Sequence, residues 1–116
     1  MAPDAPKLIV NAPRVKLISP TVARIQIPVT ARLQGEPEVG EEYYCLTEVW
    51  DWDDDTESVY QPDCEPYKKG APLKREFAAV HFYGVGSYTI TFRLRSGEKT
   101  VIAGSIDIQI RRSGSH

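Results

Sequence analysis

The chain has 116 residues, with 14 Lys or Arg and 16 Asp or Glu, so its formal net charge is −2 at neutral pH. A chain of this length predicts one domain with a hydrophobic core of its own. The balanced charge lacks the basic footprint of a nucleic-acid-binding protein, and no apolar run reaches the roughly 20 residues of a membrane-spanning helix. We therefore expect no nucleic-acid partner and no insertion into a membrane.

The first third of the chain is rich in proline and then in alternating apolar residues. Residues 1–13 lack the charged start and apolar stretch of a signal peptide, and we interpret them as a linker or a short edge strand. Residues 22–34 alternate apolar and polar side chains with a period of two, which predicts a half-buried antiparallel strand. Pro28 removes one backbone donor from that strand, so we expect a free edge or a bulge there.

An aromatic segment over residues 43–52 predicts the next strand. Its apolar side chains of one parity are expected to share the core face, and they are Tyr44, Leu46, Trp50 and Trp52. Glu48 has the same parity, and a carboxylate on a core face is costly unless it is paired or lies at the rim.

The second half of the chain contains a long irregular loop and further strands. Residues 57–75 combine three prolines with a glycine and two adjacent lysines, which predicts a loop with at most a short strand at 59–60. Residues 75–82, 88–95 and 101–110 follow as strands that are separated by glycine turns. Six or seven short strands without a helical period indicate an all-β sandwich.

Cys45 and Cys64 are the two cysteines of the chain. A disulfide between them would close a loop of about 20 residues and contribute about 3 kcal/mol to stability. It would also indicate an oxidising location, which is extracellular, on the cell surface or periplasmic. The alternative is two reduced thiols in a cytosolic protein. Two histidines at no metal-ligand spacing do not support a zinc site.

Three short motifs follow one another along the chain. Residues 50–56 read Trp-Asp-Trp-Asp-Asp-Asp-Thr, residues 81–83 read His-Phe-Tyr, and Gly86 and Tyr88 open an alternating strand. Together they resemble the PKD repeat, whose pattern is approximately W-D-F-G-D-G-T, then H-x-Y, then G-x-Y-x-V-x-L. The resemblance implies an immunoglobulin-like β-sandwich of two antiparallel sheets over residues 14–111.

The chain departs from the family pattern in two places. Asp53 and Asp55 stand where the family has glycines, and aspartate tolerates the left-handed backbone of such a turn better than most residues. An insertion of about 15 residues lies within residues 57–75, and long ordered loops are often functional. Residues 112–116 are interpreted as a tail, for which a vector origin is one explanation.

Acidic side chains are concentrated around the first motif. Asp51, Asp53 and Asp55 alternate, so in extended backbone they would point the same way, and Glu57 follows them. Calcium prefers several converging carboxylate oxygens, and some PKD-like domains bind it, so these four residues are candidate calcium ligands. The alternative is a solvated strand end in which Asp54 accepts hydrogen bonds from backbone amides of the turn.

Aromatic and basic side chains in the insertion are candidates for contact with a partner. Tyr60, Tyr67, Lys68 and Lys69 lie there, and exposed tyrosines can stack on sugars or anchor a protein interface. The alternative is a solvated loop without a ligand. Trp50, by contrast, is expected in the core.

The histidine and the tyrosine of the later motifs are interpreted as structural. Catalysis at His81 would need a nucleophile or carboxylate partner at close range, and the sequence supplies no Ser-His-Asp arrangement, Gly-rich phosphate cradle or His-pair metal motif, so we predict that the chain is not an enzyme. Tyr88 follows a glycine turn, where its hydroxyl can bond to the backbone as in the tyrosine corner of sandwich folds.

The resemblance implies an extracellular module within a larger multidomain protein. The first hypothesis is a non-catalytic binding or spacer module that makes protein–protein or protein–carbohydrate contacts through residues 57–75. The second is a purely architectural link or assembly domain, stiffened by calcium or by a disulfide and able to associate through free sheet edges. No cofactor other than calcium is expected.

Overall fold

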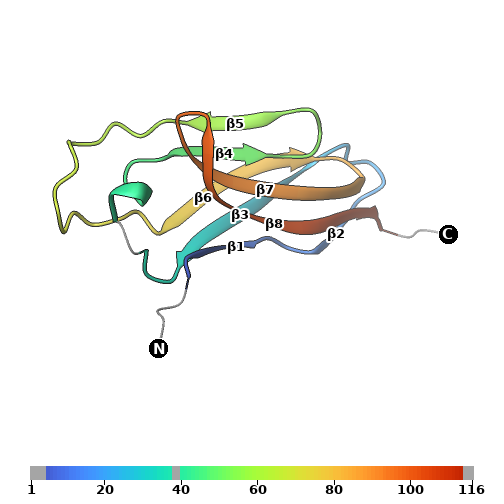
Figure 1. Ribbon diagram of the computed structural model, residues 1–116. Coiled ribbons are helices and arrows are strands. Elements are labelled where there is room, and N and C mark those ends of the chain that lie inside the picture. The colour runs from blue at the N-terminus through green and yellow to red at the C-terminus, as the bar shows by residue number, and fades with distance from the viewer. Residues whose placement is uncertain (1–4, 38–39, 114–116) are drawn as a thin grey trace.

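The computed structural model describes residues 5–37 and 40–113, which form two packed sheets (Figure 1). Over these residues the chain is all-β apart from one short 3₁₀ helix, η1, so the expected all-β class is confirmed. The elements are β1 (Lys7–Asn11), β2 (Val15–Ile18), β3 (Ile25–Gln34), η1 (Gly40–Tyr43), β4 (Thr47–Asp51), β5 (Glu57–Tyr60), β6 (Glu76–Tyr83), β7 (Gly86–Ser96) and β8 (Lys99–Arg112).

The strands are ordered β1-β3-β6 in the first sheet and β2-β8-β7-β4-β5 in the second. Neighbouring strands are antiparallel with one exception, because β2 pairs with β8 in parallel. The expectation of two purely antiparallel sheets is therefore wrong at this edge. The reason is that the chain passes from β1 in the first sheet to β2 in the second without reversing its direction (Figure 1).

The core consists of the inward-facing side chains of both sheets. The alternation predicted for β3 is confirmed, because Ile27, Val29, Ala31 and Leu33 are buried while the residues between them are exposed. They belong to one buried cluster with apolar side chains of the second sheet, such as Phe92. The period of two in the sequence thus identifies the face on which the sheets meet.

Pro28 lies inside β3 without costing a hydrogen bond to a neighbouring strand. On one side, β1 pairs with β3 only from Thr30 to Gln34, so Pro28 lies beyond the end of β1. This agrees with the free edge that the sequence predicts at this position.

Two boundaries differ from the sequence predictions. The strand expected over residues 43–52 begins only at Thr47, because residues 40–43 form helix η1. Arg112, assigned to the tail, is the last residue of β8 and donates hydrogen bonds to the carbonyl oxygens of Ser19, at 3.0 Å, and Val22, at 2.9 Å. Residues 114–116 of the expected tail lie outside the described residues. In the described part of the chain, no helix is long and apolar enough to cross a membrane.

Candidate functional site

Strand β4 runs between two ends of the sandwich (Figure 1). Polar and aromatic side chains gather at both ends. We call the first the turn end, which comprises residues 51–56 together with His81, Tyr83 and Tyr88. We call the second the disulfide end, which comprises residues 43–48 and the loop of residues 61–75. Polar groups have partners within the protein at both ends, but aromatic rings stack behind the first and a cleft opens at the second.

Asp54 organises the turn end through its two carboxylate oxygens. Oδ1 accepts a hydrogen bond from the backbone N–H of Thr56 at 3.2 Å and another from the Thr56 hydroxyl. Oδ2 lies 2.7 Å from Nε2 of His81. Both oxygens therefore have partners, and the interpretation of Asp54 as a residue that stabilises the turn is confirmed.

Aromatic rings stack behind this turn. The His81 ring lies flat on Trp52 at a centroid distance of 4.5 Å, and Trp52 lies flat on Trp50 at 5.4 Å. The hydroxyl of Tyr83 donates to the carbonyl oxygen of Trp52 at 2.7 Å. The hydroxyl of Tyr88 donates to the carbonyl oxygen of Gly84 at 3.0 Å, so the expected bond from this tyrosine to the backbone is confirmed.

These contacts shift two pKa values at the turn end. Burial by itself raises the pKa of Asp54, but the hydrogen bonds from Thr56 and His81 and the charge of His81 outweigh it, so the pKa lies below its ordinary value. Burial raises the pKa of the Tyr83 hydroxyl, and the nearby charge of Asp54 raises it further. Asp54 is therefore held as a carboxylate and Tyr83 as a neutral donor.

The four candidate calcium ligands are arranged differently from the sequence prediction. Asp53 and Asp55 have φ values of 62° and 67°, so the backbone is left-handed at both positions and the expected extended geometry is wrong. Two of the carboxylates bind the backbone instead. Oδ1 of Asp51 accepts the N–H of Asp53 at 3.0 Å, and Oδ2 of Asp53 accepts the N–H of Thr89 in β7 at 2.9 Å.

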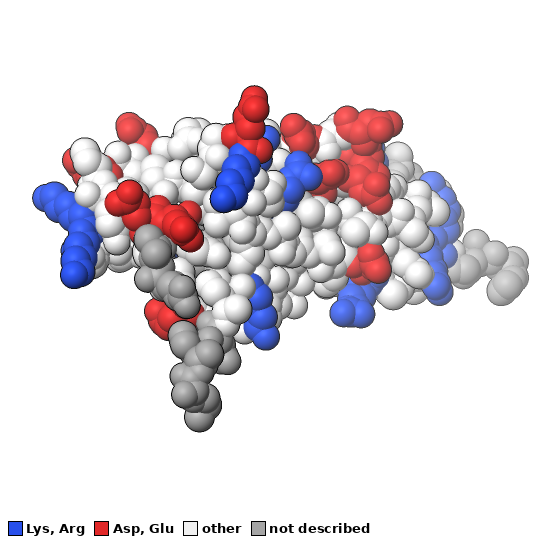
Figure 2. Space-filling view, viewed as in Figure 1, with Lys and Arg blue, Asp and Glu red and all other residues white. Residues whose placement is uncertain are grey.

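The acidic side chains nevertheless remain close to one another on the surface. Asp51, Asp53, Asp55 and Glu57 line one shallow depression, and Figure 2 shows acidic side chains gathered at this end of the molecule. Within residues 5–37 and 40–113, no three His, Cys, Asp or Glu side chains are placed to hold a metal ion. The geometry therefore favours the turn interpretation of the cluster over the calcium interpretation.

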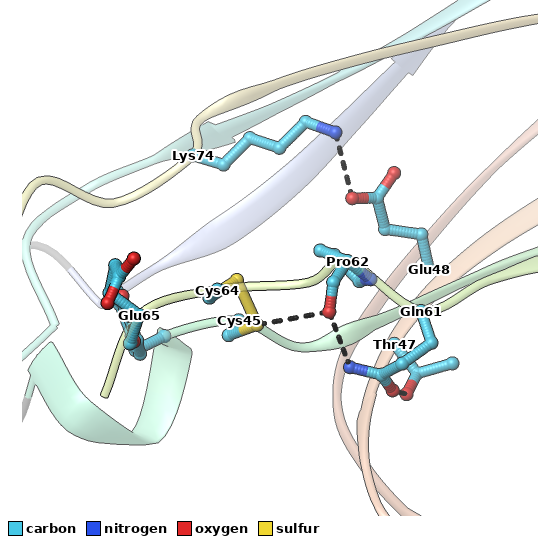
Figure 3. Close-up of a disulfide and its surroundings, with 9 residues drawn as sticks. Cys45, Thr47, Glu48, Gln61, Pro62, Cys64, Glu65 and Lys74 are labelled. Atoms are coloured by element: carbon cyan, nitrogen blue, oxygen red, sulfur yellow. Dashed lines mark hydrogen bonds and ion pairs between the residues drawn. A yellow bond between two sulfur atoms is a disulfide. The ribbon is translucent and has the colours of Figure 1, made fainter. Parts of the chain in front are cut away.

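The disulfide end is defined by a covalent bond between the loop and the segment before β4. Cys45 and Cys64 form a disulfide with a Cα–Cα distance of 6.1 Å, and the predicted pairing is confirmed (Figure 3). The Sγ atom of Cys45 lies 3.4 Å from the carbonyl oxygen of Pro62. The bond fixes the middle of the loop to the chain just before β4 enters the second sheet.

Further contacts hold the loop on both sides of the disulfide. The Tyr44 hydroxyl donates to the carbonyl oxygen of Glu65 at 2.6 Å, and the Tyr44 ring packs edge-on against Tyr67 at 5.1 Å. The Thr47 hydroxyl forms a hydrogen bond with the side-chain oxygen of Gln61 (Figure 3). The loop is therefore ordered by several residues of the segment that leads into β4.

Glu48 and Lys74 form an ion pair beneath the loop. The Lys74 Nζ atom lies 2.8 Å from Oε2 of Glu48, whose side chain is 8% exposed (Figure 3). Lys74 also lies over the rings of Phe77, at 5.1 Å, and Tyr60, at 5.7 Å. The carboxylate that the sequence placed on the core face is thus paired, as its burial requires.

A cleft of about 250 Å³ opens where the loop meets residues of both sheets, including Phe77 of β6 and Leu94 of β7. Its walls combine aromatic rings, two prolines, the disulfide and the ion pair. The lining residues are Tyr43, Tyr44, Cys45, Leu46, Glu48, Pro62, Cys64, Pro72, Lys74, Phe77 and Leu94. An apolar concavity with a few convergent polar groups is the usual form of a ligand site, so the cleft is the candidate functional site.

The four residues predicted for partner binding are not among those that line the cleft. Tyr60 is 57% exposed at the end of β5, whereas Tyr67 is half-buried against Tyr44. Lys68 and Lys69 are exposed farther along the loop. Their role in binding stays a prediction.

Sequence reasoning missed Lys74 as a site residue. The sequence feature that pointed to such a residue was Glu48, because a carboxylate on the core face of a strand requires a cation as its partner. The sequence does not indicate which lysine of the loop approaches Glu48. The disulfide and the hydrogen bonds of Tyr44 decide that, and they depend on contacts between residues about 20 positions apart.

No protein-family model, no curated protein and no solved structure matches this chain.

Proposed function

We propose that the protein is a non-catalytic extracellular binding module that contacts a protein or a carbohydrate through the cleft at the disulfide end. The observation that carries this proposal is the cleft itself, with tyrosine walls and the Glu48–Lys74 pair at one side. Tyrosine rings stack on sugars and anchor protein interfaces. The paired charges supply a donor and an acceptor that can orient one sugar ring or one side chain of a partner.

The extracellular assignment is supported by the disulfide. Such bonds persist in oxidising compartments and are rare in the cytosol. We therefore propose a location outside the cell, on its surface or in the periplasm, and the resemblance to PKD repeats supports a module of a larger protein.

We assign the sandwich to the immunoglobulin-like type, with PKD-like motifs. The strand order supports this assignment. In a seven-stranded immunoglobulin sandwich the first and the last strand belong to different sheets, and the same is true here of β1 and β8. The network of Asp54, His81 and Tyr83 is built from the residues that carry the resemblance.

A glycan array and a phage-displayed peptide library test the proposal. Pro72→Tyr inserts a ring at the cleft without removing an internal bond, and we expect it to abolish binding of any hit while the melting temperature stays unchanged. Pro66→Tyr is the matched control, since Pro66 is an exposed proline of the same loop that does not line the cleft. Loss of binding in both variants, or only in the control, would move the site to the outer part of the loop and favour Lys68 and Lys69.

A purely architectural role is the second candidate, and a free sheet edge favours it. Strand β6 ends the first sheet and pairs on one side only, with β3. The absence of any hit on both libraries would favour this role over the binding module.

A further inference from the structure

Within residues 5–37 and 40–113, four strands lie at the ends of the two sheets, and β6 alone among them has a long exposed edge that is uncharged after Glu76. β2 and β5 contain four residues each, and they carry the charged residues Lys16 and Glu57. β1 is covered by β8. Gly104 of β8 lies so close to β1 that a Cβ atom at this position would be 2.6 Å from the carbonyl oxygen of Leu8. β6 contains eight residues, and its sequence from 77 to 83 has no charged residue apart from the titratable His81 and no proline. Natural edge strands are usually protected by shortness, charge, proline or a covering segment.

The pairing with β3 determines which backbone groups of β6 point outward. The N–H of Leu33 donates to the carbonyl oxygen of Arg75 at 2.8 Å, in the same register that pairs Ala31 with Phe77 and Val29 with Ala79. In an antiparallel pair, hydrogen-bonded and non-hydrogen-bonded positions alternate.

It follows that the odd-numbered residues of β6 bond to β3 and the even-numbered residues face the free edge. Ala78, Val80 and Phe82 therefore direct both their N–H and their C=O groups away from the sheet. Their side chains lie on the outer face of the sheet, where Val80 is 55% exposed and Phe82 is 53% exposed.

We propose that β6 pairs antiparallel with β6 of a second copy of this chain, with Val80 on the two-fold axis. In this register Val80 lies opposite the second copy's Val80, and Ala78 lies opposite its Phe82. These are the positions whose backbone groups point outward, so each pair exchanges two hydrogen bonds. The two three-stranded sheets then form one continuous sheet across the axis.

The side chains are complementary to themselves in this register. Two β-branched valines meet at the centre, and a small alanine faces a large phenylalanine on either side, which suits cross-strand packing. Glu76 lies opposite Gly84 of the second copy, so no like charges are placed opposite one another. The charge pattern therefore permits β6 of a second copy to pair here, whereas the charges on many edge strands would repel a second strand.

This interface is independent of the cleft. Ala78, Val80 and Phe82 do not line it, so loss of the dimer would leave the proposed binding function untouched. One strand from each copy buries less than the roughly 1,200–2,000 Å² of a stable interface, so we expect a weak dimer that forms between micromolar and millimolar protein.

Sedimentation velocity across that concentration range tests the pairing. The wild type is expected to shift reversibly from monomer to dimer, and Val80→Lys to weaken the dimer about tenfold or more, because it opposes two charges at the axis. Val59→Lys is the matched control: Val59 is 53% exposed and also lies on an edge strand, β5. A monomeric wild type at every concentration, or a dimer that Val80→Lys leaves intact, would overturn the proposal.

Cross-linking tests the register. Hydrogen-bonded residues of an antiparallel pair have Cα atoms about 5.5 Å apart, within the roughly 4.4–6.8 Å range of disulfides. Val80→Cys is therefore expected to form a covalent dimer on mild oxidation, and Val59→Cys to remain monomeric. Equal cross-linking of both variants would indicate random collisions and contradict the register.

Discussion

The two ends of β4 differ in what their paired polar side chains surround, because aromatic rings stack behind the turn, whereas a cleft of about 250 Å³ opens at the disulfide end. At the turn end, Asp54 has partners on both oxygens, and the hydroxyls of Tyr83 and Tyr88 donate to backbone carbonyls. At the disulfide end, side chains of the same kinds surround a cleft. The turn end holds most of the residues that resemble a known family, together with Asp53 and Asp55, which depart from its pattern, and the disulfide end includes the insertion. The turn-end motif thus contributes contacts that stabilise the fold, and the cleft at the disulfide end is where we propose that binding occurs.

The largest expected effect comes from removing the disulfide. We expect Cys45→Ser combined with Cys64→Ser to lower the free energy of unfolding by about 3 kcal/mol, because the unfolded chain gains the entropy of a loop of about 20 residues. Urea denaturation measures this change. The stacking and hydrogen bonds of the turn end should survive in the folded fraction, and loss of structure there would show that the two ends are not separable.

Breaking the ion pair at the cleft is expected to have the next largest effect on stability. Lys74→Met leaves the Glu48 carboxylate buried without its cation, and we expect a loss of about 2 kcal/mol, less than for a fully buried pair because Lys74 is half exposed. Chemical denaturation compares it with Lys69→Met, which is expected to change stability by less than about 0.5 kcal/mol. Equal effects of the two variants would contradict a specific role for Lys74.

A substitution at a turn residue with left-handed backbone is expected to have a smaller effect on stability. Asp55→Ala should lower stability by about 1 kcal/mol, since alanine tolerates positive φ poorly. Asp55→Gly should avoid this loss because glycine adopts the same backbone freely. If thermal melts found alanine and glycine equivalent at this position, the positive φ of Asp55 would not limit stability.

The smallest effect is confined to acidic pH. Since the pKa of Asp54 in the folded protein lies below the ordinary value of 3.8, the unfolded chain binds the proton more readily. The stabilisation by Asp54 is therefore complete above that value and is lost as the pH falls through the lowered pKa. We expect Asp54→Asn to flatten the dependence of stability on pH in this window. Asp63→Asn, at an exposed loop aspartate, should leave that dependence as in the wild type.

The sequence predicted the parts of the molecule that follow from local patterns. The period of two in β3 identified its core face, and the two cysteines identified the disulfide. The parallel pairing of β2 and the start of β4 at Thr47 were not predicted, because they depend on where the chain crosses between sheets and on helix η1.

The candidate site was predicted only in part. Sequence patterns indicated the insertion as the functional segment and Glu48 as a residue in need of a partner. They could not indicate the cleft, because Tyr44, Phe77 and Leu94 reach it from separate parts of the chain. Calcium binding by the turn carboxylates stays a prediction, but the extended backbone considered for it does not occur, because Asp53 and Asp55 both have positive φ.

A thermal melt of the oxidised protein in excess calcium and again in chelator tests most directly whether the turn end is complete without a ligand. The account predicts the same midpoint in both conditions, because the turn carboxylates already bind backbone amides and His81. Calcium at about a hundred times its dissociation constant would add about 2.7 kcal/mol, or a rise of about 10 °C for a domain of this size. A rise of that order would contradict the account and make the turn end a metal site.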